Sequence, residues 1–281
     1  MANKKNQHYV SQFHLKNFSV NGNRKTINLF NIASNKFIGN KAKIKHQCSE
    51  DWFYGKDSTI DYVLEHFEMR TSNIIKKVVV SDYVPSRYSE EHSDLISYIC
   101  LLSAGTKYKE ESTNDSIDGV LKHVFSFVNE FTVDKKYTKE FLDKFKIINK
   151  NAIDWSVEAA IEMSPLLRDL KYVLLLNQTS LSFWTSDNPV VFYNKLLEAL
   201  RPNSRNTYYA AKGLQIFYPI SPRHCLLFYD ETTYGFGSKT GRIIKTDKEF
   251  DVEQINLIQY INANNNLYFN EYFDEKYLEA V

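Results

Sequence analysis

The chain has few of the residues that mark specialised folds. Its 281 residues include only three cysteines, Cys48, Cys100 and Cys225, which lie far apart and form no Cys-x-x-Cys pair. An odd number of scattered cysteines provides neither a disulfide framework nor zinc-ligand spacing, so we expect a reducing compartment. Glycines (nine) and prolines (six) are also few, and we find no low-complexity tract and no internal repeat.

Long hydrophobic runs are missing as well. The first eight residues, Met-Ala-Asn-Lys-Lys-Asn-Gln-His, contain no apolar core, which argues against a secretory signal. The longest apolar run that fits a helix, residues 173–176, is too short to cross a bilayer. We therefore expect a cytoplasmic protein without a membrane partner.

Several catalytic signatures are absent. The sequence contains no Gly-rich phosphate loop, no Gly-x-Gly-x-x-Gly, no Gly-x-Ser-x-Gly and no His-Glu-x-x-His. Their absence argues against the common nucleotide-binding, serine-hydrolase and zinc-protease classes.

The residues that are present predict an α+β fold in one domain, residues 1–281. The pattern divides this domain into a basic N-terminal segment with a β-hairpin (1–50), a helical region of five to six helices (58–177) and a sheet-rich region (178–281). Runs rich in apolar and aromatic residues, bounded by turn residues, predict hairpin strands over 26–32 and 36–44, joined at residues 33–35, and C-terminal strands over 214–220, 224–229 and 267–269. These C-terminal strands predict a mixed sheet with one covering helix.

Helical periodicity and capping residues predict the remaining elements. Helices are expected from Ser58 or Thr59 to the stop at Pro85, from Ser89 to Gly105, over 117–128, from Thr138 through Ile148, and over 152–163. Ser164 followed by Pro165 predicts a further helix with Leu166, Leu170 and Leu174 on its buried face. Asp251 and Gln254 predict a capping box for the covering helix, and residues 275–280 a short closing helix.

The charge of the chain is unevenly distributed, although the net charge is only +1. Residues 1–49 contain nine lysines and arginines and no acid, whereas residues 247–281 carry eight acids and two lysines. This asymmetry indicates either a face that binds a polyanion such as nucleic acid or a basic segment that pairs with the acidic one.

One stretch stands out as a candidate site. In residues 181–193, two aromatic and β-branched runs flank the sequence Thr-Ser-Asp-Asn-Pro. Turn residues between two strands place Asp187 and Asn188 at the end of a sheet, where side chains face a cleft. The alternative is that Asp187 only accepts backbone N–H bonds and holds the turn.

Two further residues are candidates for catalysis. Glu68 interrupts the apolar helical stripe of Leu64, Thr71 and Ile75, and a carboxylate there needs a cation, hydrogen-bond donors or a metal as partner. A structural ion pair with Arg70 or Arg168 is the alternative role. His8 lies among aromatic residues and is either a satisfied structural residue or a proton shuttle or ligand.

The residues also resemble a known family. Gln7-His8-Tyr9-Val10 with Phe13, Leu15, Asn17 and Phe18 is similar to the N-terminal signature of the bacterial family known as domain of unknown function 4238. Residues 53–55, Glu68, residues 183–191, residues 213–222 and Ile255-Asn256-x-x-Gln259 resemble its later motifs. Ser11 stands where the family usually has Pro, and Lys107 lies near a usual Arg-Thr pair. The resemblance implies a fold and recurring polar residues but no reaction.

Two functional hypotheses follow. In the first, the protein is a metal-dependent hydrolase or nuclease-like enzyme acting on nucleic acid or another phosphate-bearing substrate. His8, Glu68, Asp187 and Asn188 would be catalytic, Glu68 and Asp187 would hold a divalent cation, and Gln7, Tyr9, Lys16 and Asn17 would contact the substrate. The expected order of elements after Pro165 resembles restriction-type nucleases, but residues 214–219 lack their second acid and lysine. In the second, the protein is a non-catalytic module that binds nucleic acid or protein through the basic segment.

Overall fold

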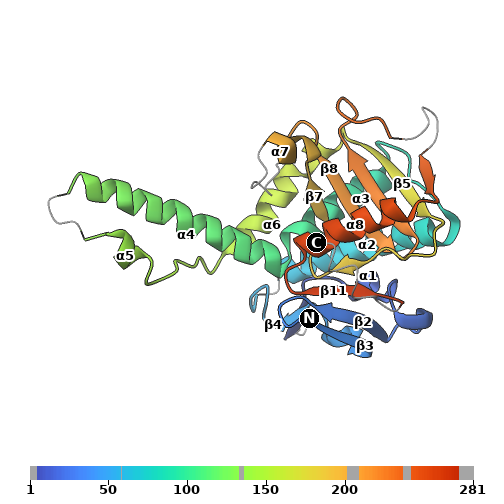
Figure 1. Ribbon diagram of the computed structural model, residues 1–281, viewed down its shortest axis with the longest axis horizontal. Coiled ribbons are helices and arrows are strands. Elements are labelled where there is room, and N and C mark those ends of the chain that lie inside the picture. Colours follow the sequence, from blue (N-terminus) through green and yellow to red (C-terminus); the bar gives the residue numbers. More distant parts are fainter. Residues whose placement is uncertain (1–4, 58, 133–135, 201–208, 237–241, 272–281) are drawn as a thin grey trace.

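Strands from both ends of the chain share one sheet in the computed structural model, which describes residues 5–57, 59–132, 136–200, 209–236 and 242–271 (Figure 1). This sheet has four strands in the order β3-β2-β11-β6, beside a two-stranded sheet β1-β4 and a five-stranded sheet β10-β5-β9-β8-β7. The strands are β1 (Asn6–His8), β2 (Thr26–Asn31), β3 (Lys36–Lys43), β4 (Ser49–Asp51), β5 (Lys171–Asn177), β6 (Thr185–Ser186), β7 (Val191–Tyr193), β8 (Gln215–Ser221), β9 (His224–Tyr229), β10 (Ile243–Thr246) and β11 (Asn266–Phe269).

Most of the helices lie in the middle of the chain. They are α1 (Gln12–Lys16), α2 (Thr59–Ser81), α3 (Glu90–Ala104), α4 (Lys107–Glu130), α5 (Lys139–Leu142), α6 (Ala152–Met163), α7 (Lys195–Leu200) and α8 (Glu249–Asn262), with 3₁₀ turns at Val20–Gly22, Ile44–His46 and Ser164–Leu167. Among the described residues, every helix is too short or too polar to span a lipid bilayer.

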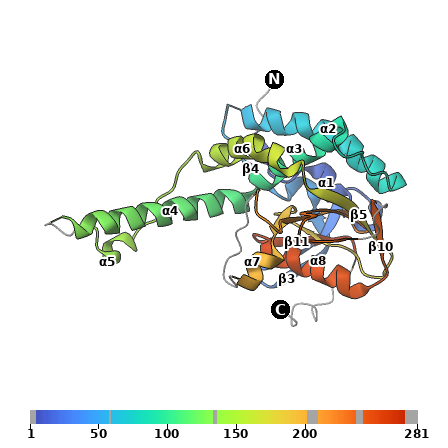
Figure 2. The ribbon, with the colours of Figure 1, turned by 90° about the horizontal axis from the view of Figure 1, so that it is seen from above.

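The five-stranded sheet is the centre of a three-layer core. Alternate residues of a strand point to opposite faces, and Leu174, Tyr218 and Phe228 pack against α2, α3 and α6. Val173 and Leu227 belong to the opposite face, where they pack under α8. Figure 2 shows this order, with α2, α3 and α6 above the sheet and α8 below it.

The predicted α+β class is confirmed: the chain has an N-terminal hairpin, a helical middle and a C-terminal mixed sheet covered by α8. β2 pairs antiparallel with β3, and β10 pairs parallel with β5 while the other pairs of that sheet are antiparallel. Ser89 caps α3 as expected, because its Oγ accepts the backbone N–H of His92 at 3.2 Å.

The helix predicted from Ser164 to Leu174 is wrong. Pro165 lies within a short 3₁₀ turn, Ser164–Leu167, and the apolar residues that were expected to continue the helix form β5. β5 lies between β9 and β10 and is buried on both faces, so its sequence is continuously apolar rather than alternating. A short continuous apolar run does not distinguish a buried strand from a buried helix. The order of elements after Pro165 therefore differs from the one that resembled restriction-type nucleases.

The helix predicted from Thr138 is much shorter than expected. α5 ends at Leu142, and the chain then runs back along α4 without helical structure. Side chains of α4 accept hydrogen bonds from the backbone of this segment: Asp118 Oδ1 accepts the N–H of Ile147 at 2.7 Å, and Asn114 Oδ1 accepts that of Asn149 at 2.8 Å. These bonds replace the backbone hydrogen bonds that a helix would have made.

The capping box predicted for α8 is also wrong. α8 begins at Glu249, two residues before Asp251, and its N-cap Lys248 makes no side-chain cap. The Asp251 carboxylate instead accepts the hydroxyl of Thr246 at 2.6 Å. The closing helix predicted over 275–280 lies outside the described residues.

Candidate functional site

The N-terminal motif connects the small sheet to the helices. The amide of Gln7, 1% exposed, accepts the N–H of Tyr54 at 2.7 Å and donates to the carbonyl of Gly55 at 3.2 Å. The Tyr54 hydroxyl then donates to the carbonyl of Gly105 at 2.7 Å. A side chain at position 105 would place its Cβ only 2.9 Å from that hydroxyl, so glycine allows this close approach. The Gln7 amide, predicted to contact a substrate, therefore holds the Phe53-Tyr54-Gly55 segment in place.

The other motif residues make similar contacts within the chain. Tyr9 packs on Phe53 with ring centroids 5.1 Å apart, and burial, followed by the charges of Cys48 and Asp187, raises its pKa. Asn17 donates to the carbonyl of Ile220 at 2.9 Å. Lys16, next to Asn17, is half-buried.

His14 is a buried polar residue that sequence reasoning missed. Its Nε2 lies 2.8 Å from Thr185 Oγ1 and its Nδ1 lies 3.2 Å from the Tyr218 hydroxyl, so it connects α1 to both larger sheets. Complete burial lowers its pKa to about 3, which keeps it neutral. The four-residue spacing with the buried Val10 and Phe18 is the signal that could have placed it on the inner face of α1.

Asp187 accepts three backbone N–H groups from one short loop. Its Oδ1 accepts from Asn264 at 2.8 Å, and its Oδ2 from Asn265 at 2.8 Å and Asn266 at 3.0 Å. The residue is 2% exposed; burial raises its pKa to about 6, while the three amides lower it. The carboxylate therefore holds the turn that leads from α8 into β11.

Polar residues of α8 bind the rest of the same segment. Asn256 Oδ1 accepts the N–H of Trp184 at 2.8 Å, and Gln259 Nε2 donates to the carbonyl of Pro189 at 3.0 Å. Asn188 Nδ2 donates to the carbonyl of Asn262 at 2.9 Å. The Asp-Asn-Pro stretch thus links β6 in one sheet to β7 in the other, with α8 as its support.

The charges of Glu68 and Asp187 affect different tyrosines. After burial, the charge of Glu68 raises the pKa of Tyr54, and it also contributes to the raised pKa of Tyr218. The charge of Asp187 acts instead on Tyr9 and other side chains near β11. His8 Nε2 lies 3.3 Å from Gln12 Nε2. Arg70, a candidate partner for Glu68, pairs with Asp94 at 2.9 Å.

The described residues do not fit a divalent cation held by Glu68 and Asp187. No group of three or more His, Cys, Asp or Glu side chains within the described ranges is arranged to hold a metal ion. Both oxygens of Asp187 already accept amide N–H groups. We therefore derive no chemistry through a metal at these two residues.

A serine, a histidine and an aspartate form a hydrogen-bonded row at the turn between β8 and β9. Ser221 Oγ lies 2.7 Å from His224 Nδ1, and His224 Nε2 lies 2.9 Å from Asp82. A nucleophile must face its substrate, yet Ser221 is 4% exposed and also accepts the N–H of Arg223 at 3.2 Å. The row thus joins the end of α2 to the β8–β9 turn.

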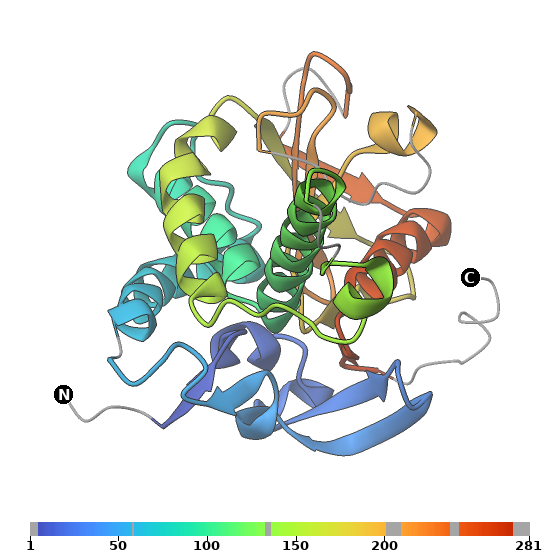
Figure 3. The same cartoon turned by 90° about the vertical axis from the view of Figure 1, so that its left-hand side faces the viewer.

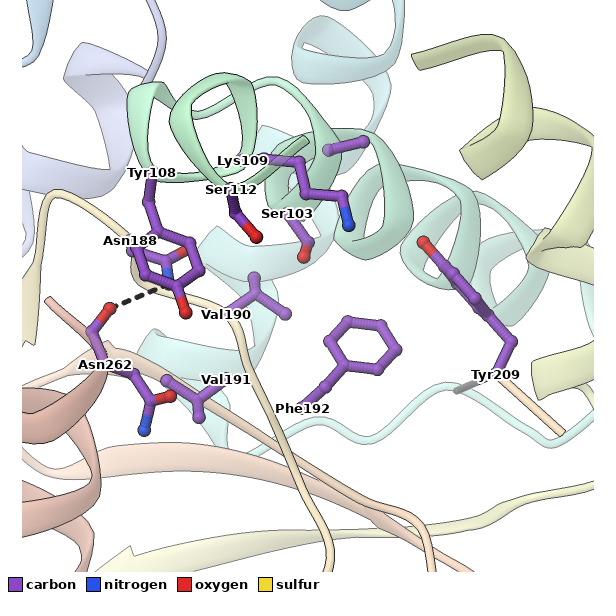
Figure 4. A pocket seen from close by; sticks show the side chains of 11 residues that line it. Ser103, Tyr108, Lys109, Ser112, Asn188, Val190, Val191, Phe192, Tyr209 and Asn262 are labelled. Atoms are coloured by element: carbon purple, nitrogen blue, oxygen red, sulfur yellow. Dashed lines mark hydrogen bonds between the residues drawn. The ribbon is translucent and has the colours of Figure 1, made fainter. Parts of the chain in front are cut away.

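A pocket of about 110 Å³ opens between the start of α4 and the segment that contains Asn188 (Figure 4). The Lys109 ammonium and the Ser103 hydroxyl point toward its centre, and the Phe192 and Tyr209 rings form a wall. Lys109 pairs with no acid in the described part of the chain, and the surrounding protein lowers its pKa by desolvation. The pocket is lined by Ser103, Ala104, Tyr108, Lys109, Ser112, Asn188, Val190, Val191, Phe192, Tyr209 and Asn262.

A shallow groove on the N-terminal hairpin, which we name the basic groove, gathers positive charge. It has a volume of about 530 Å³ and contains Lys36, Lys41, Lys43 and His46 but no acid. Ile38 lies between them and is exposed. The remaining lining residues are Leu29, Asn31, Ser34, Ala42, Gln47 and Asn266.

The basic segment was predicted either to bind a polyanion or to pair with the acidic segment, and its ion pairs bear on the second role. Within the described ranges, no lysine or arginine of residues 5–49 pairs with an acid of residues 247–271. Lys5 pairs with Asp51 at 2.9 Å. Figure 3 shows the hairpin on the outside of the molecule, away from the helical layers. Internal neutralisation of the basic segment is therefore not observed in this part of the chain.

Comparison with known proteins agrees with the motifs. No curated protein and no solved structure matches the chain significantly. The family described as "Protein of unknown function (DUF4238)" matches residues 6–272, from β1 to just past β11. Lys107, which lies near the Arg-Thr pair expected from the resemblance, pairs through its Nζ with Glu50 at 2.5 Å. Because the match covers nearly the whole chain, the protein belongs to the DUF4238 family.

Proposed function

We propose that this protein binds the phosphate backbone of nucleic acid in the basic groove. The observation that supports the proposal is the lining of the groove, which has three lysines and a histidine but no carboxylate. The net charge of the whole chain is only +1, so this concentration of one sign is local. Lysines on such a surface act as point charges on phosphates and release counterions from the nucleic acid.

The proposal predicts a measurable salt dependence. Fluorescence anisotropy with a labelled oligonucleotide, single-stranded or duplex, should give a slope of log affinity against log salt of about −2 to −3.5 for three to four phosphate contacts. The variant with Lys36, Lys41 and Lys43 all replaced by Glu should lose about two units of that slope. Its affinity should fall by at least roughly 30-fold at low salt.

A matched control separates the groove from net charge. Lys76, Lys195 and Lys245 are exposed and lie on other elements, so replacing these three by Glu changes the charge of the chain equally. This control should retain most of the affinity. Equal losses in both variants, or no binding by the unmodified chain at low salt, would contradict the proposal.

A second candidate function is binding of a small phosphate-bearing ligand in the Lys109 pocket. The observation that favours it is an ammonium group without an acidic partner among the described residues, directed into a pocket beside the hydroxyl of Ser103. Perturbed lysines in pockets are recurrent features of ligand sites. Such a ligand would serve equally as the substrate of a hydrolase, whose catalytic residues stay a prediction.

Calorimetric titration tests this second candidate with inorganic phosphate and with a nucleoside monophosphate as probes. Replacing Lys109 with methionine removes the charge and keeps the length, so binding should weaken about tenfold or more, as expected for one charge-assisted bond. Lys245→Met is the control, because Lys245 lies on β10 and is not part of the lining of the pocket. Unchanged affinity of Lys109→Met would exclude the pocket as the site.

The proposed setting is the bacterial cytoplasm. Cys48, Cys100 and Cys225 are all buried free thiols, and burial raises the pKa of Cys100 to about 12. Three unpaired cysteines are compatible with a reducing compartment.

A further inference from the structure

A helical arm, which we define as the described residues 116–132 and 136–149, projects from the body of the protein. It consists of the outer part of α4 and the returning chain with α5. Figures 1 and 2 show the arm from two directions, and in both it extends beyond the sheets and the other helices. Apart from the return segment, no described element covers the outer part of α4.

The return segment covers only one side of α4. Phe125 stacks on Tyr137 with ring centroids 5.1 Å apart, and Lys122 lies over the ring of Phe145 at 5.6 Å. The backbone of Ile147 is bound to Asp118 on the same side of the helix. The arm is therefore a helix with a strap along one face, and its other faces are open to a partner.

An apolar stripe runs along α4 on a side that the return segment leaves open. It consists of Val120, Val124, Phe127 and Phe131, which we name the seam. The four side chains are between 46% and 74% exposed. Their spacing of four, three and four residues is the alternation of a and d positions in a coiled coil, which favours packing against another helix.

The exposed apolar area of the seam is at the upper end of what monomers show. Val128, 41% exposed, lies one turn from Val124 on α4 and extends the seam. At roughly 100 Å² for each partly exposed side chain, these five residues expose on the order of 500 Å². The largest apolar patch of a monomer is about 300–600 Å² and is often a contact surface. Four residues of the return segment, Tyr137, Phe141, Phe145 and Ile148, are also 37% to 64% exposed, but they lie on the strap and not on the seam.

The order of residues in the seam identifies the partner. Two valines come first and two phenylalanines follow, so an identical seam laid antiparallel places Val120 opposite Phe131 and Val124 opposite Phe127. Each layer then contains one small and one large side chain, which is the arrangement that fills a core without voids. A surface that complements itself by reversal is suited to a two-fold dimer. We propose that the arm is a dimerisation element, with the seam packed antiparallel against that of a second copy of this chain.

The oligomeric state tests the proposal on the full-length chain. Light scattering coupled to size exclusion, at about 50 μM so that a Kd of 1 μM or tighter is saturated, should give twice the mass of one chain. Replacing Val124 and Phe127 by Glu should give one chain. The control Gly119→Glu/Ser126→Glu adds the same two charges on a side of α4 outside the seam, where a Cβ at Gly119 meets nothing within 4 Å, and should stay dimeric.

Three results would overturn the proposal: a monomeric wild type at this concentration, a seam variant that stays dimeric, or a control that dissociates like the seam variant. Circular dichroism of each variant establishes that the fold is retained. Salt titration separates this interface from nucleic-acid binding, because apolar packing does not weaken as salt rises.

Disulfide trapping tests the antiparallel order. The three natural cysteines are buried, so introduced cysteines are the reactive ones. A mixture of the single variants Val124→Cys and Phe127→Cys should form a disulfide between the two different chains under mild oxidation. Efficient cross-linking of either variant with itself, and none in the mixture, would exclude the antiparallel order.

Discussion

Replacing Asp187 with alanine is expected to lower the free energy of unfolding by about 3–5 kcal/mol. The carboxylate accepts the N–H groups of Asn264, Asn265 and Asn266, and alanine leaves all three without this partner. Each unsatisfied buried donor costs about 1–3 kcal/mol. For a chain of this size the melting temperature should fall by roughly 10 °C. Urea unfolding at pH 7, above the pKa of Asp187, measures the loss.

Two further variants test whether the lost backbone hydrogen bonds cause the destabilisation of Asp187→Ala. Asp187→Asn keeps one acceptor oxygen but turns an NH₂ group toward an amide donor, so an intermediate loss of about 2 kcal/mol is expected. Asp57→Ala removes an exposed acceptor that holds one N–H, from Thr59 at 3.3 Å, and should change stability by less than about 0.5 kcal/mol. A gain in stability for Asp187→Asn would instead indicate a strained functional carboxylate.

Acidification is expected to destabilise the protein through His14 by about 3 kcal/mol between pH 7 and pH 4. Burial lowers the pKa of His14 to about 3 in the folded chain, against about 6.5 in the unfolded chain. Between these values the unfolded chain binds a proton that the folded chain does not. The stability that His14 contributes is therefore complete above pH 6.5 and is lost as the pH falls toward 3.

The comparison of wild type with His14→Leu isolates this contribution. Asp187, whose raised pKa gives the opposite pH dependence between about pH 4 and 6, and His92, whose pKa burial lowers to about 4, are present in both chains and cancel. The stability difference between the two chains should narrow by about 3 kcal/mol from pH 7 to pH 4. His66→Leu, at an exposed position, should show no narrowing. A constant difference for His14→Leu would mean that folding does not lower the pKa of His14.

Sequence patterns predicted most of the elements because they report local physics. The caps Ser89 and Thr138 accept the amide N–H groups of His92 and Phe141. Three neighbouring residues are sufficient for such a cap, so it is visible in a short window. The hairpin of β2 and β3 was equally visible from its two strand-like runs and the turn residues between them.

The wrong predictions concern segments whose backbone hydrogen bonds are made by residues far away in the sequence, which a short stretch of sequence does not contain. β5 became a strand because β9 and β10 pair with it on both sides, although its apolar run suits a helix equally well. Residues 143–149 lost their predicted helix because Asn114 and Asp118, about 30 residues earlier, bind their backbone. The helical period also predicted α4 without showing that the seam stays uncovered.

For the candidate site, the sequence by itself determined which residues are unusual: Gln7, Asp187 and Asn188, the polar pair on α8, and the one-signed charge of the N-terminal segment. Only the tertiary structure decided what each of them contacts. Gln7 and Asp187 hold backbone segments distant in sequence, the Lys109 pocket combines separate elements, and the basic groove gathers lysines of β3 beside Asn266 without an acid in its lining. The physical reason is that hydrogen bonding and charge act over a few ångströms in space, whereas sequence order specifies only the chain neighbours.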